Sequence, residues 1–339
     1  MLRSLLLRHA AFASVAQVVL IAGPISMGHA QFVPGTGKLV NTDDLEQENW
    51  SYNFNFPKSS KEEDEQIRYP LGQSNNNMWL ESPKRGAPDV VRRVETPPGG
   101  LAGSKGALYL RTRDSGIPGR PGFKQAQDDF ILAARPVSVA QSPSFVVRVF
   151  LPEWNEWEQR AGVSFGIRAG LTGPMEKEKP AKSVKRLFNR NAKEKVVEME
   201  PYYPGFFLEF VPKSSPHNKV GTDHAMLLIR ANEMGHEVPG PRLMQTGWWT
   251  FGMSVTPDAR CHYYACQGVR DLTERDYLTS TLPYNIRGTT FNTIFFNVCS
   301  ADDGNSWSTP WIIDDPKVFC IPSGQIPQFA NQSIERLGF

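Results

Sequence analysis

One acidic residue interrupts an otherwise apolar and aromatic segment, because Glu209 lies within Phe206-Phe-Leu-Glu-Phe-Val211. A carboxylate can serve as general acid, general base or nucleophile, but glycoside hydrolysis needs a second carboxylate roughly 5 to 10 Å away. The sequence does not identify that second group, and a single Glu on a strand is more often ion-paired than catalytic. Glu209 is therefore the best lone catalytic candidate, and whether the protein is an enzyme stays open.

Several strand-like segments carry residues of mixed chemistry on one side of the alternation. The candidates are Arg148, Arg168, Phe207, Glu209 and Trp248. Flat rings stack on the C–H surfaces of sugars, and charged groups hydrogen-bond sugar hydroxyls, so this mixture suits a ligand-binding face. The alternative is an ordinary half-solvated outer face on which the two arginines and Glu209 form cross-strand ion pairs.

Hard oxygen ligands gather in one predicted loop, where Asp302, Asp303 and Asn305 surround Gly304. Such oxygens could hold a structural calcium ion, although the spacing differs from that of an EF-hand. The alternative is a plain Asp-Asp-Gly-Asn turn.

Four cysteines, an even number, allow three disulfide pairings. Cys299 and Cys320 each end a predicted strand, so a bridge between them could join two strand ends. Cys261 and Cys266 could pair only if the chain turns after Tyr264, because five extended residues span about 16 Å and a disulfide needs Cα atoms within about 7 Å. Without a Cys-x-x-Cys spacing, a zinc site is disfavoured.

The elements that must position these residues read as short strands. Aromatic and β-branched residues alternate with polar ones and are bounded by Pro, Gly, Asn and Asp. The segments are Trp50–Phe56, Ala107–Thr112, Asp129–Leu132, Ser144–Leu151, Gly162–Ala169, Phe206–Val211, Ala225–Arg230, Trp248–Val255, Cys261–Tyr264, Phe291–Val298 and Trp311–Phe319. This pattern predicts an all-β fold, an antiparallel two-sheet β-sandwich.

The rest of the chain divides by composition. Residues 31–48 predict a flexible lead-in, 57–105 long loops, and 175–200 a charged helical insertion with good helix formers from Val184 to Met199. A single sandwich domain is expected over 49–322, followed by a C-terminal tail, 323–339.

The first thirty residues have the layout of a cleaved secretory signal: a basic start, an apolar run and small residues ending at Ala30. The expected location is therefore secreted or in the periplasm and cell envelope, and no later segment is apolar enough to span a membrane. Removing Arg3 and Arg8 leaves 35 basic residues against 35 acidic ones, which gives no electrostatic support for nucleic acid binding.

The hairpin pattern Trp248-x-x-Phe251-x-Met253-x-Val255, followed by Pro-Asp and by the closing Trp311-Ile-Ile-Asp-Asp315, resembles the concanavalin A-like lectin and glucanase superfamily. The resemblance implies a jelly roll in which the first and last strands pair, placing Trp50–Phe56 beside Ile312–Phe319. The Glu-x-Asp-x-(x)-Glu strand of the glucanases is absent; the nearest match, Glu153-Trp-Asn-Glu-Trp-Glu158, lacks the central Asp.

These observations predict an exported β-sandwich that binds a glycan or polysaccharide without catalysing its conversion. One alternative is a jelly-roll polysaccharide hydrolase or lyase that uses Glu209, and another is a structural envelope protein without a ligand.

Overall fold

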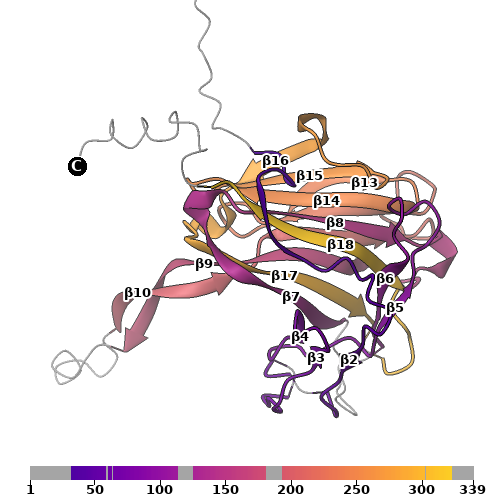
Figure 1. Ribbon diagram of the computed structural model, residues 1–339, viewed down its shortest axis with the longest axis horizontal. Helices are drawn as coiled ribbons and strands as arrows, with labels where there is room; N and C mark the ends of the chain where they lie inside the picture. Colours follow the sequence, from indigo (N-terminus) through magenta and orange to yellow (C-terminus); the bar gives the residue numbers. More distant parts are fainter. Residues whose placement is uncertain are drawn as a thin grey trace, which may run out of the picture.

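The computed structural model of the 339-residue chain describes residues 32–322 except 59, 63, 114–124, 181–192 and 302. These residues form a β-sandwich of two antiparallel sheets packed face to face, from which a long hairpin extends (Figure 1). The described helical elements are four single 3₁₀ turns, η1 (Val139–Gln141), η2 (Trp154–Glu156), η3 (Glu274–Asp276) and η4 (Pro283–Asn285). The predicted all-β, two-sheet fold class is confirmed.

The first sheet, sheet A, has eight described strands in the order β16-β15-β14-β8-β18-β6-β5, with β1 also paired to β18. Its strands are β1 (Lys38–Thr42), β5 (Val90–Glu95), β6 (Gly106–Arg111), β8 (Ser144–Leu151), β14 (Gly247–Val255), β15 (Cys261–Gln267), β16 (Tyr277–Thr281) and β18 (Trp311–Cys320).

The second sheet, sheet B, has ten described strands in the order β13-β12-β11-β9-β17-β7-β4-β3-β2, with β10 paired to β9. Its strands are β2 (Tyr52–Asn53), β3 (Gln73–Ser74), β4 (Trp79–Glu81), β7 (Ala126–Ser138), β9 (Gly162–Pro180), β10 (Lys193–Tyr202), β11 (Gly205–Val211), β12 (His224–Arg230), β13 (Val238–Leu243) and β17 (Thr290–Ser300).

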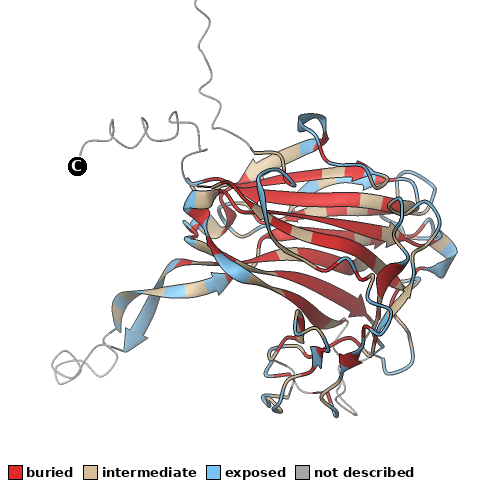
Figure 2. Ribbon diagram, in the orientation of Figure 1, coloured by how far each residue is buried: buried red, intermediate tan, exposed pale blue. Residues whose placement is uncertain are grey.

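The core lies between the sheets, where alternate residues of each strand point inward. The rings of Phe165 in sheet B and Trp311 in sheet A stack with centroids 4.6 Å apart, and Phe206 meets Phe251 across the same space at 5.7 Å. Figure 2 shows the buried residues concentrated along the central strands. Each sheet therefore has an outer face, which is the side turned away from the other sheet. Side chains on that face do not belong to the core between the sheets and can take part in ligand binding or catalysis.

Two sequence predictions about the N-terminal part were wrong. The segment expected as a flexible lead-in contains β1, which pairs with β18, the last strand. Within Trp50–Phe56 only β2 is a strand, and it pairs with β3 in sheet B. The first and last strands do pair, but the earlier segment takes the place next to β18 because the aromatic residues that follow pack on sheet B, where Tyr52 meets Phe130 at 5.0 Å.

The charged insertion is not helical where the structure describes it. Lys193–Tyr202 is strand β10, which pairs with the distal half of β9 to form the arm that leaves the sandwich (Figure 1). Residues 181–192 lie outside the described part. Alternating charges that could have paired four apart on a helix instead pair across two strands, as Lys179 does with Glu198 and Lys195 with Glu176 at 2.9 Å.

The disulfide predictions also fail, because all four cysteines are free and buried. Cys261 and Cys266 lie on the uninterrupted strand β15, so the chain does not make the turn that their pairing requires. Cys299 lies beside Val298, whose partner Phe165 stacks on Trp311 at the start of β18. Cys320 ends that strand nine residues later, about 30 Å away at strand rise, which is too far for a bridge.

Candidate functional site

A row of four residues crosses the outer face of sheet B. Phe207 of β11 lies opposite Gly166 of β9, Gly166 opposite Asn297 of β17, and Asn297 opposite Asp129 of β7. Side chains directly opposite one another on adjacent strands are close enough to interact. The strand register thus gathers residues from four separate segments into one place.

Arg168 lies on β9 two residues after Gly166, and its side chain extends toward this row. Its Nε donates to Asn297 Oδ1 at 2.6 Å, and Asn297 Nδ2 donates to Asp129 Oδ1 at 2.5 Å. The guanidinium also lies 3.8 Å from the Asp129 carboxylate, with its side chain 11% exposed. Burial lowers the pKa of Arg168, Asp129 opposes that shift, and the charges of Arg230 and Arg85 add to it. The arginine is held in one orientation by a buried amide and a buried acid.

Two glycines make the space for these side chains. A Cβ at Gly166 would lie 2.6 Å from Asn297 Oδ1 and 2.7 Å from the ring of Phe207. A Cβ at Gly205 would lie 2.9 Å from Cγ of Arg168. The bare backbone at these positions lets the amide, the ring and the guanidinium lie flat on the sheet.

Aromatic rings frame the guanidinium groups. Phe207 has Arg168 at 5.6 Å and Arg230 at 5.7 Å from its centroid, and Tyr203 has Arg168 at 5.4 Å. Tyr203 in turn meets Phe295 edge to face at 4.8 Å. Cation–π contacts of this kind hold a guanidinium plane over a ring while its N–H groups stay available at the edge.

The local charges are unequal. Arg85, Arg168 and Arg230 surround the row, whereas Asp129 is its buried carboxylate and Glu237 pairs with Arg230 at 3.5 Å. Arg230 is 37% exposed at its side chain, and its Nε donates to the hydroxyl of Tyr284 at 2.7 Å. The surface therefore presents guanidinium and phenol groups to solvent above a fixed polar layer, and it can hydrogen-bond a polyhydroxylated or anionic ligand.

The predicted catalytic candidate lies on the same face. Glu209 sits at a bulge of β11 opposite Val163 and Met226. Burial, and after it the negative charge of Glu237, raises its pKa. Within the described residues no cation forms an ion pair with it, so the expected salt bridge is not present. The row itself contains one further carboxylate, Asp129, and that group is already engaged.

Two of the five predicted binding residues lie on the opposite side of the molecule. Arg148, on the outer face of sheet A, is 4% exposed and binds Asp315 at 3.1 Å and Asp271 at 2.9 Å. Trp248, on the neighbouring strand β14 opposite Phe150, is 5% exposed because the loop at Pro97 covers it and accepts its indole N–H at 3.3 Å. Alternation placed both residues correctly on an outer face but could not show that other segments cover them.

In the predicted calcium loop, the carboxylate oxygens of Asp303 already accept hydrogen bonds from neighbouring residues of the same loop. Asp303 Oδ1 accepts from the amide N–H groups of Asn305 at 2.8 Å and Ser306 at 2.6 Å, and Oδ2 accepts from the Ser306 hydroxyl. Asp302 lies outside the described residues. Among the residues that are described, no three His, Cys, Asp or Glu side chains gather closely enough to hold a metal ion. Calcium binding stays a prediction.

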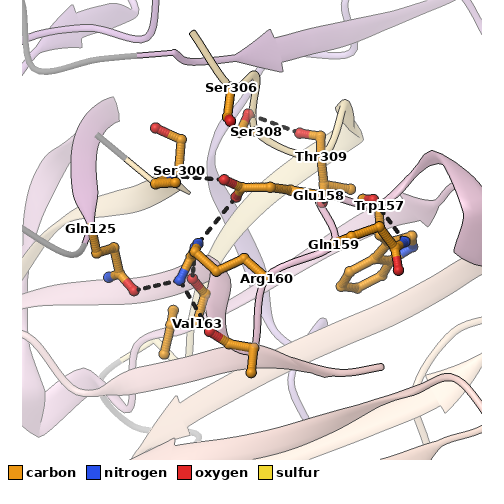
Figure 3. A network of polar contacts seen from close by, with 12 residues as sticks. Gln125, Trp157, Glu158, Gln159, Arg160, Val163, Ser300, Ser306, Ser308 and Thr309 are labelled. Carbon is orange, nitrogen blue, oxygen red and sulfur yellow. Dashed lines mark hydrogen bonds and ion pairs between the residues drawn. The ribbon is translucent and has the colours of Figure 1, made fainter. Parts of the chain in front are cut away.

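The acidic segment that came nearest to the glucanase motif folds as a loop around η2. Glu158 accepts from the Ala301 amide at 2.8 Å and from Arg160 Nε at 3.3 Å, while Arg160 Nη1 donates to Gln125 at 3.2 Å (Figure 3). Burial raises the pKa of Glu158, and Arg160 opposes the shift. Figure 3 shows Glu158, Arg160 and Gln125 pointing at one another, so the Glu158 carboxylate is engaged within this polar cluster.

Sequence reasoning missed Asn297 and Asp129, whose place in the row depends on strand register. It also passed over Gly162-Val-Ser-Phe-Gly166, which matches the Gly-x-Ser-x-Gly pattern of hydrolases. That pattern needs the serine on a sharp turn between strand and helix. Ser164 instead lies within the long strand β9 and is buried, with no hydrogen-bond partner for its hydroxyl among the described residues. The match carries no nucleophile.

No protein-family model matches the chain, and no curated protein matches it. Solved structures with a similar arrangement include a carbohydrate esterase from Shiga toxin-encoding bacteriophage phi24B (10% identity, 78% of this chain and 97% of that chain, TM-score 0.40). Others are the VIP36 exoplasmic/lumenal domain in its Ca2+/Man3GlcNAc-bound form (9%, 76% and 89%, 0.36) and the globular domain of T. cruzi calreticulin (10%, 89% and 93%, 0.32). At these values the similarity concerns the β-sandwich alone.

Proposed function

We propose that this protein binds carbohydrate through the outer face of sheet B. The observation that carries the proposal is the Arg168–Asn297–Asp129 chain, which holds a guanidinium fixed beside Tyr203 and Phe207. Fixed planar donors beside aromatic rings are what a sugar-binding surface requires, since the rings cover C–H faces and the donors reach hydroxyls. A fixed donor also loses less conformational entropy on binding than a free side chain would.

The buried members of the row serve to position the exposed ones. Asn297 is fully buried and Asp129 nearly so, whereas Tyr203 and Arg230 are partly exposed. Tyr203 and Arg230 are therefore the groups that would contact a sugar, with the edge of Arg168 between them.

The test is retention of the full chain on a panel of immobilised polysaccharides. Wild type is expected to bind at least one of them, and Tyr203→Ala and Arg230→Ala are expected to weaken that binding about tenfold each. Lys195→Ala, on the exposed arm, is the matched control and should bind as wild type does. If both site variants bind as tightly as the control, sheet B is not the binding surface. Retention of none of the panel would favour a structural protein without a ligand.

A second candidate function is polysaccharide hydrolysis or elimination, favoured by the raised pKa of Glu209 and by its lack of an ion pair in the described part of the chain. Release of new chain ends from a bound polysaccharide, abolished in Glu209→Gln with binding intact, would support it. Unchanged activity in that variant would remove Glu209 from the reaction.

Export belongs to the same proposal. It rests on the leader pattern of residues 1–30, which lies outside the described residues. Separately, no helix in the described part of the chain is long and apolar enough to cross a membrane. N-terminal sequencing of protein recovered from expressing cells should find Gln31 first. Retention of Met1 would contradict cleavage at Ala30.

A further inference from the structure

A second group of arginines and rings lies on the other side of the sandwich, on the outer face of sheet A. Arg92 of β5 lies opposite Tyr109 of β6, and Val90 lies opposite Arg111. With Trp307 from the loop before β18, these residues line a hollow of about 180 Å³. Strand β5 ends the path of paired strands in this sheet, so the hollow is open toward that edge.

The rings hold the arginines in place. The Arg92 guanidinium lies 4.9 Å from the Tyr109 centroid, and the guanidinium groups of Arg111 and Arg113 each lie 5.3 Å from that of Trp307. Arg111 is fixed further because its Nε donates to the carbonyl of Ser308 at 2.9 Å. Three cationic groups are thus oriented by two rings.

Neither Arg92 nor Arg111 forms an ion pair with any described residue. The nearby carboxylate of Asp89 is already engaged, because it lies 3.1 Å from Lys58 Nζ and accepts the Thr112 hydroxyl at 3.0 Å. On the same outer face Arg148, in contrast, forms an ion pair with Asp315 at 3.1 Å. The hollow therefore carries positive charge that the described fold does not neutralise.

We propose that this hollow binds the carboxylate groups of an acidic polysaccharide. Guanidinium forks match planar carboxylates in two parallel hydrogen bonds, and a chain bearing an acid on successive sugars can engage Arg92 and Arg111 together. Nucleic acid fits less well: base stacking needs open ring faces, and here the guanidinium groups lie over Tyr109 and Trp307. The choice of a glycan among polyanions rests on the proposed function, whereas the anion site itself does not.

The experiment measures binding of the full chain to polygalacturonate at low and high salt. Wild type is expected to bind, with affinity that falls as salt rises. Arg92→Gln with Arg111→Gln should lose about tenfold or more in affinity. Arg135→Gln with Arg275→Gln, two exposed arginines elsewhere, removes the same charge and should bind as wild type does. Because Arg111 also bonds to Ser308, Arg92→Gln alone, at an exposed position, is tested alongside and should lose affinity with an unchanged melting temperature.

Three outcomes would overturn the inference: no binding by folded wild type, equal loss in both double variants, or equal binding of polyglutamate or single-stranded DNA lost through the same arginines. Tyr203→Ala separates this site from that of sheet B. If binding of the acidic polysaccharide persists in Tyr203→Ala but is lost in the Arg92/Arg111 variant, it occurs on sheet A. That result would hold even if carbohydrate binding on sheet B were disproved.

Discussion

Asn297 accepts a 2.6 Å hydrogen bond from Arg168, although 129 residues separate them in the chain. They meet because β9 and β17 are neighbours in sheet B and because Gly166, directly opposite Asn297, has no side chain that would crowd the Asn297 amide. Asn297 in turn donates a hydrogen bond from its Nδ2 to Asp129 Oδ1. The fully buried side-chain amide of Asn297 thus sets the orientation of the Arg168 guanidinium, one edge of which is exposed.

Replacing Asn297 by Leu tests that relationship. The change leaves Arg168 Nε without its partner and removes one of the two hydrogen bonds that Asp129 Oδ1 accepts, the other coming from Gln127 Nε2 at 2.8 Å. We expect a loss of about 1 to 3 kcal/mol in the free energy of unfolding. Urea denaturation monitored by tryptophan fluorescence measures it. Asn292→Leu, on the same strand but partly exposed, should change stability by less than about 0.5 kcal/mol. Equal effects from the two variants would mean that the hydrogen-bond chain adds nothing.

Gly166→Ala should destabilise the fold through crowding. Its Cβ would lie 2.6 Å from Asn297 Oδ1 and 2.7 Å from Phe207, and overpacking of this kind costs about 1 to 3 kcal/mol. The same change in a Phe207→Leu background should cost less, because one of the two crowding groups is then smaller. A penalty that is the same in both backgrounds would contradict the steric explanation.

Lys58→Met should be among the most destabilising single changes. Lys58 is buried 2.5 Å from Asp128 and 3.1 Å from Asp89, and its removal leaves two carboxylates in a site with no substitute cation from the described residues. Breaking a buried pair in this way costs about 3 to 5 kcal/mol. Adding Asp128→Leu to Lys58→Met should restore much of the lost stability, and a double variant as unstable as the single one would contradict the prediction.

Asp314 gives a prediction about pH. Burial, opposed by a hydrogen bond from Ser104, raises its pKa to about 6 from an unfolded value near 3.8. The folded state therefore holds a proton that the unfolded state releases, so its stabilising effect is complete below about pH 4 and is lost as pH rises through 6. Asp314→Asn mimics the protonated form. The wild type should lose up to about 3 kcal/mol relative to this variant between pH 4 and 7, measured by urea denaturation at each pH. Parallel curves for the two proteins would show that Asp314 does not titrate in this range.

The burial of alternate strand residues, and with it the fold class, could be predicted from the alternation of apolar and polar residues in the sequence. Phe145, Val147 and Val149 are fully buried as their spacing indicated, and the fold class follows from many such segments. The pairing of the Lys and Glu residues near Lys179 could not be predicted, because the same charges suit neighbours on a helix or partners across two strands.

The site was harder to predict for a related reason. Alternation indicates that Arg168 and Phe207 face outward, but not which strand lies next to theirs, so Asn297 and Asp129 could not be associated with them. The sequence also does not show which residues are covered by distant segments. Trp248 lies on an outer face beneath the loop at Pro97, which is 151 residues earlier in the chain.

The length of β9 has a mechanical consequence. One strand runs from Gly162 through the centre of sheet B into the arm, flanked by β11 and β17 for its first half and by β10 for its second. Tension applied to the arm along the strand would load the hydrogen bonds to both flanking strands at once, in shear, because those bonds lie perpendicular to the pull. The arm therefore continues the same strand that carries Arg168. Pulling the arm away from the sandwich would require breaking the hydrogen bonds that hold β9 in the interior of sheet B.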